Sequence, residues 1–198
     1  MYKLILASQS PRRRQLLEQA GFLIHVSSLE VSENIDVNIN PTTMAQMLAR
    51  RKCEAWVNSN NALKNQKILV LAADTLVAIS GRVLGKPKNI SEAQYYLGLL
   101  SGQTHSVITG VCVYAFDSEV YFESAVTTKV EFRALEDDEI SKYIASGEPM
   151  DKAGAYGIQG EGRRFVKTFE GSWSNVVGLP MEYIETLFKE NNWDVGRK

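Results

Sequence analysis

The sequence predicts an α/β protein built on a mixed sheet with helices around it. Apolar runs of strand length alternate with helical segments through the N-terminal half. Two long β segments then follow each other at 104–116 and 119–133, joined by Asp117–Ser118 like a hairpin. Alternating strands and helices favour parallel pairing, whereas a hairpin pairs antiparallel, so we expect both kinds in one sheet.

The first expected elements are a short strand, a capped helix and a second strand. KLILA at 3–7 and FLIHV at 22–26 are the two apolar runs. Between them, Ser10 is a suitable N-cap for a helix that begins at Pro11 and runs to about residue 20. Gly21 fits the left-handed position that ends such a helix.

A polar loop at 27–40 leads into a longer helix and the most apolar segment of the chain. Pro41 begins the helix, whose expected core stripe contains Met44, Met47, Leu48 and Ala55. The run KILVLAAD then continues through LVAIS toward a turn at Gly81. Such an unbroken apolar run is typical of a strand that is covered on both faces.

The C-terminal half is expected to combine the hairpin with three helices. Ser91 and Gln94 form a plausible capping box for a helix to Leu100. Acidic residues at 136–138 favour the start of a second helix, which Gly147 closes. We expect irregular structure at 147–162, a strand near 163–169 and a final helix at about 180–191.

Composition restricts the class of protein. The 198 residues suffice for one large core, and we expect a single domain over 1–198. The net charge of -1 argues against a general nucleic-acid binder. Two cysteines form no metal-ligand spacing, no apolar run is long enough for a membrane span, and no secretory leader precedes the first strand. A cytoplasmic protein without a membrane partner is therefore expected.

Three consecutive arginines in the first turn of the first helix are the strongest functional signal. Arg12, Arg13 and Arg14 lie where the helix dipole is positive and backbone amides lack partners. Cations there are locally unfavourable unless an anion binds, so the segment is a candidate phosphate site. The alternative is that one or more of these arginines point into solvent.

Asp74 is the candidate catalytic residue because it ends the run ILVLAAD, at an expected strand end where α/β sheets bind ligands. A carboxylate there can hold a divalent ion or activate water, although it can also simply cap a turn. Thr75 adds a hydroxyl beside it. Glu33 is a candidate second carboxylate, although acids in polar loops are usually solvated.

Three further polar residues are weaker candidates. Lys52 lies in a charged helical face that is normally solvated, while Lys86 follows Gly85 in a stretch that does not match a Walker A loop. Gln159 in GIQGEG offers a donor and an acceptor, the complement of a uracil or thymine edge, or it bonds its own backbone. His25 and His105 have no nucleophile beside them and are interpreted as structural.

Five segments together resemble the Maf family of nucleoside triphosphate pyrophosphatases. They occur in family order between residues 6 and 180 and read LASQSPRRRQLL, VLAADTLVAISGRVLGKP, LSGQTHSVITGV, SGEPMDKAGAYGIQG and NVVGLP. The resemblance implies an inosine-triphosphatase-like fold, with an elongated mixed sheet and a central cleft between two lobes. It also implies metal-dependent hydrolysis of a nucleoside triphosphate to the monophosphate and pyrophosphate.

The resemblance assigns expected roles to the candidates. Arg12, Thr75 and Gln159 match the subgroup that acts on dTTP and UTP rather than on 7-methyl-GTP. Asp74 is then the catalytic base, and Glu33 with Asp74 would hold Mg²⁺ or Mn²⁺. The phosphate-binding residues would be Ser8, Arg12, Arg13, Lys52 and Lys86.

Other properties stay open at this point. The family resemblance also carries an association with inhibition of septum formation, so a nucleotide-sensing regulator is the alternative function. Dimers occur in the family that this chain resembles, so a homodimer is one of the oligomeric states open to it. The ranking of pyrimidine and modified nucleotides, the metal used and the physiological role do not follow from the sequence.

Overall fold

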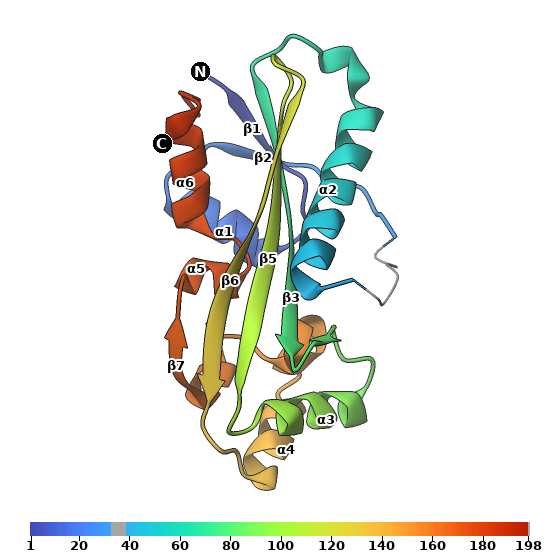
Figure 1. Cartoon of the computed structure of the whole chain (residues 1–198), viewed down its shortest axis with the longest axis vertical. Helices are drawn as coiled ribbons and strands as arrows, with labels where there is room; N and C mark the ends of the chain where they lie inside the picture. The colour runs from blue at the N-terminus through green and yellow to red at the C-terminus, as the bar shows by residue number, and fades with distance from the viewer. Residues whose placement is uncertain (33–38, 198) are drawn as a thin grey trace.

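The computed structural model describes residues 1–32 and 39–197. A mixed β-sheet runs through the length of the molecule (Figure 1). Within these residues the strands follow the order β2-β1-β3-β5-β6-β7, with β4 paired to β3. β1 pairs in parallel with β2 and β3, while the β3–β5, β5–β6 and β6–β7 pairs are antiparallel. The predicted α/β fold class with a mixed sheet is therefore confirmed.

The N-terminal elements form as the sequence predicts. β1 (Lys3–Leu6) leads to α1 (Pro11–Gln19), and the Ser10 side chain accepts a hydrogen bond from the Arg13 amide. Gly21 has φ of 84°, the left-handed geometry that releases the chain from α1. β2 spans Ile24–Val26 and is shorter than the expected strand.

α2 (Pro41–Ser59) lies across β3 and β5 and begins at an Asn40 cap. Its close approach depends on Gly110, since a Cβ there would collide with the backbone of Ala45. The predicted stripe is partly wrong, because Met47 is 42% exposed and the buried face is built around Ala45, Leu48 and Ala49. Small residues face the sheet because α2 lies so close to it.

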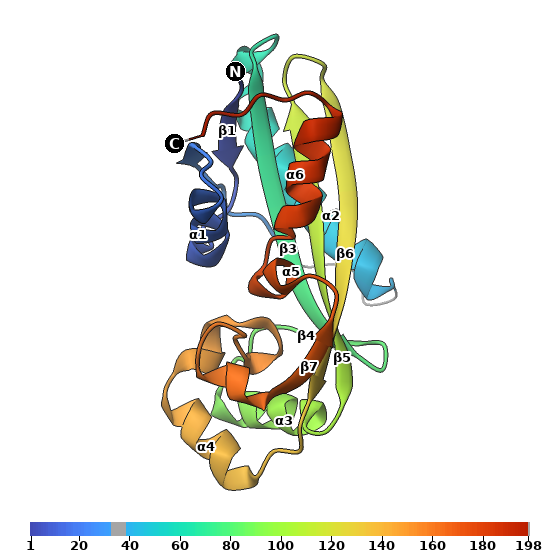
Figure 2. The same cartoon turned by 90° about the vertical axis from the view of Figure 1, so that its left-hand side faces the viewer.

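Three long strands form the spine of the molecule: β3 (Ile68–Ile79), β5 (Thr104–Ala115) and β6 (Val120–Phe132). Alternate β3 residues enter different cores. Leu69, Leu71 and Ala73 pack with residues of α1 and α6 (Met181–Glu190), whereas Val70 and Ala72 pack with those of α2. Figures 1 and 2 show α6 and α2 on opposite sides of the sheet. This two-sided burial explains the unbroken apolar run.

The other end of the spine carries a smaller lobe. β4 (Arg82–Leu84), α3 (Ile90–Leu100), α4 (Asp137–Ala145) and β7 (Val166–Glu170) surround a second core there (Figure 2). Three short 3-10 turns connect α4 to β7, as the irregular region predicted: η2 (Glu148–Asp151), η3 (Ala153–Ala155) and η4 (Glu161–Phe165).

Two local predictions need correction. Ser91 does not cap α3; the Asn89 side chain does, accepting from the Glu92 amide at 2.9 Å, because it precedes the first helical residue. A short helix, α5 (Trp173–Val177), was not expected from the sequence. It is held by Ser172, whose hydroxyl accepts from the Asn175 amide at 3.0 Å. No helix in the described ranges has the length and apolar character to cross a membrane.

Candidate functional site

A cleft of about 1000 Å³ opens between the two lobes and is lined by residues from both. Figure 2 shows α1 and α5 on one side of this region and the turns that follow α4 on the other. All eight described candidates line the cleft, whereas Glu33 lies outside the described residues. These eight are Ser8, Arg12, Arg13, Lys52, Asp74, Thr75, Lys86 and Gln159.

Arg13 is the most firmly held cation of the cleft. Its side chain is buried, and its Nε donates to the Gly178 carbonyl at 2.8 Å. Its two terminal nitrogens donate to Ser8 Oγ at 3.0 Å and to Thr75 Oγ1 at 3.1 Å. One guanidinium therefore joins the β1–α1 loop, β3 and the turn after α5, and keeps its positive charge at the cleft wall.

A buried polar chain supports Thr75 from behind. Thr75 Oγ1 lies 3.0 Å from Thr109 Oγ1, which donates to the Asn175 carbonyl at 3.1 Å. The Asn175 amide nitrogen in turn donates to the Val107 carbonyl and to Thr128 Oγ1. Thr109 and Asn175 are fully buried and were not predicted as site residues, although Asn175 begins the NVVGLP segment. These two residues hold the Thr75 hydroxyl in place at the wall of the cleft.

Asp74 lies in the middle of β3, not at its carboxyl end as the sequence predicted. The neighbouring β1 pairs only as far as Leu71, so the cleft opens beside β3 just beyond that point. Lys52 from α2 donates to Asp74 Oδ1 at 2.5 Å, and both side chains are largely buried. The pair places a cation and a carboxylate together on one wall.

The described residues contain no cluster of three His, Cys, Asp or Glu side chains suited to a metal ion. Asp74 is nevertheless a hard oxygen donor that lines the cleft. Mg²⁺ is commonly held by only one or two carboxylates, with substrate phosphates and water completing its shell. The donor set therefore fits an ion that arrives with a polyphosphate.

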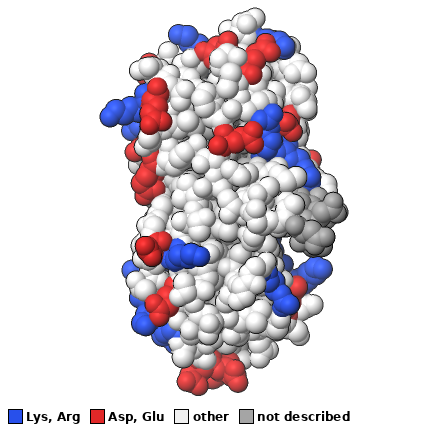
Figure 3. Space-filling model, viewed as in Figure 1, with Lys and Arg blue, Asp and Glu red and all other residues white. Residues whose placement is uncertain are grey.

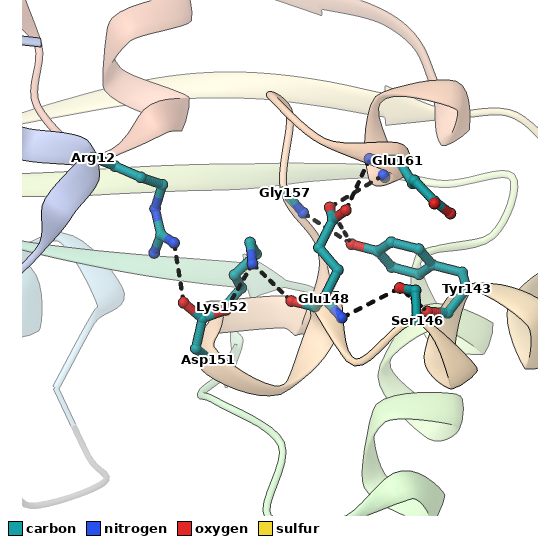
Figure 4. A network of polar contacts seen from close by, with 9 residues as sticks. Arg12, Tyr143, Ser146, Glu148, Asp151, Lys152, Gly157 and Glu161 are labelled. Atoms are coloured by element: carbon teal, nitrogen blue, oxygen red, sulfur yellow. Dashed lines mark hydrogen bonds and ion pairs between the residues drawn. The ribbon is translucent and has the colours of Figure 1, made fainter. Parts of the chain in front are cut away.

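Arg12 extends across the cleft to the smaller lobe (Figure 4). Its Nη1 lies 3.2 Å from Asp151 Oδ2, and Lys152 Nζ lies 2.6 Å from the other oxygen of that carboxylate. Partial burial raises the pKa of Asp151, but the bonds from Lys152 and Arg12 outweigh it and hold the pKa below its usual value. Asp151 and Lys152 were not predicted as site residues, although both lie in the segment SGEPMDKAGAYGIQG.

The remaining candidates lie at the rim. Lys86 and Gln159 are exposed, and neither side chain has a hydrogen bond or ion pair within residues 1–32 and 39–197. On the face drawn in Figure 3, acidic and basic side chains are interspersed, with no extended basic surface among the described residues there. The described cleft lining contains both signs of charge: the basic side chains are Arg12, Arg13, Lys52, Lys86 and Lys152, and the acidic ones are Glu30, Asp74, Glu148 and Asp151.

His105 supports the cleft wall without lining it. It is buried, and its Nε2 lies 2.8 Å from the hydroxyl of Tyr156, a residue that lines the cleft. Burial lowers the pKa of His105 to about 4. The ring is therefore neutral near pH 7 and packs edge-on against Phe132 and Tyr156. His25 is exposed on β2, away from the cleft.

Comparison with known proteins shows what this chain is similar to. A solved HAM1 protein from Coxiella burnetii aligns over 96% of this chain and 100% of its own length, at 16% identity and a TM-score of 0.49. A Bdellovibrio bacteriovorus protein named dTTP/UTP pyrophosphatase is 46% identical over 94% of this chain and 97% of its own. A Bacillus pumilus protein of the same name is 47% identical over 91% and 92%. The family model described as Maf-like protein matches residues 3–191, and the chain therefore belongs to the Maf family.

Proposed function

We propose that this protein hydrolyses dTTP and UTP to their monophosphates and pyrophosphate. Membership of the Maf family and the names of the relatives support the substrate class. The observation that carries the proposal is the position of Arg13, which lies in the same cleft as Asp74 and bonds to Thr75 beside it. A polyanion bound at the N-terminus of α1 would thus reach a carboxylate able to activate water.

The charges of the cleft suit a triphosphate. The N-terminal turn of α1, with Ser10, Pro11 and Arg12 at the cleft, would bind phosphate oxygens through amides and guanidinium. Ser8 is within bonding distance of Arg13 and would contribute a hydroxyl. Lys52 and Lys86 would neutralise charge on the phosphates, including the charge that develops on the leaving pyrophosphate.

The reaction is a substitution at the α phosphorus. Asp74 would accept a proton from the attacking water as the water oxygen bonds to phosphorus. The bond from phosphorus to the α–β bridging oxygen breaks, and pyrophosphate leaves with the electron pair. A divalent ion such as Mg²⁺ or Mn²⁺, held by Asp74 and, we propose, Glu33, would supply charge neutralisation on the phosphates. Thr75 and Gln159 would distinguish the base.

A nucleotide panel tests this function directly. With Mg²⁺, purified protein should release pyrophosphate and monophosphate from dTTP and UTP faster than from CTP, GTP, ATP or 7-methyl-GTP. Release of orthophosphate, or equal rates on all bases, would contradict the proposal. Binding of dTTP without any hydrolysis would instead favour the regulator of septum formation. The panel should be repeated with Mn²⁺ and with EDTA.

We also propose that the protein hydrolyses these nucleotides in the cytoplasm. Cys53 and Cys112 are buried free thiols, which suits a reducing compartment. Nucleoside triphosphates are substrates of the same compartment, so removal of unwanted pyrimidine nucleotides from the pool is the role we propose.

A further inference from the structure

The segment that carries Gln159 is packed around one carboxylate from the preceding turn (Figure 4). A Cβ at Gly160 would collide with the Glu148 carboxylate, and one at Gly162 would lie 2.8 Å from the Tyr143 hydroxyl. One at Gly157 would lie 2.8 Å from Lys152 Cε. Close packing against these side chains, and at Gly162 also against the backbone of Gly157, therefore explains the glycines of YGIQGEG.

Glu148 holds the C-terminal end of this segment by hydrogen bonds to the backbone. One carboxylate oxygen accepts from the Glu161 amide at 2.9 Å, and the other accepts from the Gly162 amide at 3.3 Å. The second oxygen also accepts from the Tyr143 hydroxyl at 2.9 Å. Bonds from backbone amides to an ionised carboxylate are stronger than those between neutral groups.

Tyr143 transmits the same constraint to the N-terminal end. Its ring is fully buried, and its hydroxyl accepts from the Gly157 amide at 3.2 Å while donating to Glu148. Burial and the bond to Glu148 raise the pKa of Tyr143, so the hydroxyl keeps its proton and stays a donor. The pair therefore grips the loop on both sides of Gln159.

Glu148 is itself anchored from two directions. Its backbone amide donates to Ser146 Oγ at 3.2 Å, and its carbonyl accepts from Lys152 Nζ at 2.7 Å. Gly147 precedes it with φ of 77°, the left-handed conformation from which the η2 turn begins. The side-chain amide of Gln159 has no hydrogen-bond partner among the described residues. Its position is therefore set by the loop backbone, which Glu148 and Tyr143 hold.

We infer that Glu148 is a positioning residue for base selection, acting with Tyr143 through the loop that carries Gln159. This inference rests on the proposed dTTP/UTP hydrolysis. A loop held at both ends presents the Gln159 amide in one arrangement, which makes its hydrogen-bonding pattern selective. Without Glu148 the loop samples several arrangements, and the amide no longer discriminates between pyrimidine edges.

Glu148→Gln tests the inference because it keeps the size of the side chain and removes its charge. The KM for dTTP should rise about tenfold while kcat changes less than about threefold. The preference for dTTP over dCTP, measured as the ratio of kcat/KM values, should fall by a similar factor. Glu170→Gln removes an exposed carboxylate on β7 outside the cleft and should behave as wild type.

A second variant shows whether the effect acts through this contact. Gly160→Ala places a methyl group against the same carboxylate. As a single variant it should lower the preference for dTTP over dCTP. Combined with Glu148→Gln it should add little, since both changes release one loop. Additive effects, or a Glu148→Gln protein with unchanged dTTP preference, would overturn the inference.

Amide hydrogen exchange separates this inference from the proposed function. In Glu148→Gln protein without nucleotide, the Glu161 and Gly162 amides should exchange at least about tenfold faster, with α4 unchanged. Unchanged exchange would overturn the inference whatever the activity. A wild-type protein that hydrolyses neither dTTP nor UTP would overturn the proposed function, and the exchange result would still decide the support of the loop.

Discussion

The Arg13 guanidinium donates to the Thr75 hydroxyl over 3.1 Å and joins two segments that are 62 residues apart in the chain. The same guanidinium donates to the carbonyl of Gly178, which is 165 residues from Arg13 along the sequence. A contact that spans such separations requires the long β3 and the turn after α5 to meet at the N-terminus of α1. It joins Ser8, proposed to bind phosphate, and Thr75, proposed to contact the base, in one polar network.

Arg13→Lys should therefore damage the protein although it conserves charge. A lysine cannot reach the Gly178 carbonyl, Ser8 and Thr75 at once. We expect kcat/KM for dTTP to fall at least tenfold and the free energy of unfolding to fall by about 1–3 kcal/mol. Steady-state kinetics and urea unfolding measure both. Arg14→Lys is the control because Arg14 is exposed and pairs with Glu18 one turn further along α1. Equal behaviour of the two variants would contradict this role.

Asp74→Asn should retain the fold and lose turnover by roughly 10²–10⁴-fold, because the amide cannot accept the proton from water. Circular dichroism and thermal melting check the fold, and pyrophosphate release checks turnover. Asp138→Asn, on the exposed surface of α4, serves as the control. Turnover near the wild-type level would remove Asp74 from the mechanism.

Asp151→Asn should improve substrate binding, the opposite of the usual effect of a change in an active site. The Asp151 carboxylate pairs with Arg12 and adds negative charge to a cleft proposed to bind a polyanion. Its removal should lower the KM for dTTP about two- to fivefold at low ionic strength, since the carboxylate is largely exposed and screened. The gain should shrink in high salt. A raised KM would show that Asp151 positions Arg12 instead.

Because His105 is buried, we expect the free energy of unfolding to decrease as pH falls. Burial lowers its folded-state pKa from 6.5 to about 4, so the unfolded chain binds a proton at a higher pH than the folded chain does. Stability from this group is complete above about pH 6.5 and is lost between about pH 6.5 and 4, by up to roughly 3 kcal/mol. Urea unfolding from pH 4 to 7.5 measures the slope.

His105→Gln supplies the comparison for that slope. The variant cannot titrate in this range, so its stability should depend less on pH than that of the wild type. Its absolute stability near pH 7 should be lower because the packing against Phe132 is lost. If both proteins show the same slope, His105 is not the group responsible.

Much of the fold followed from local signals. Ser10, Pro11 and Gly21 mark the ends of α1 through capping and backbone geometry, which depend on near neighbours. The β5–β6 hairpin and the buried β3 followed from apolar patterning. The wrong cap of α3 was a local error, since Asn89 and not Ser91 precedes the first helical residue. The wrong stripe on α2 has a tertiary cause, because α2 lies close to the sheet at Gly110 and Met47 faces outward.

The candidate site divides in the same way. Residue chemistry together with the resemblance to the Maf family indicated eight described residues, and all eight line one cleft. Only the tertiary structure decided that Asp151 pairs with Arg12, that Asn175 supports Thr75 and that Glu148 holds the loop of Gln159. The Arg12–Asp151 and Thr109–Asn175 contacts join residues 139 and 66 positions apart, so they depend on strand register and on how the lobes meet. The Glu148 contact spans 13 residues and depends on how the turns after α4 fold back on one another.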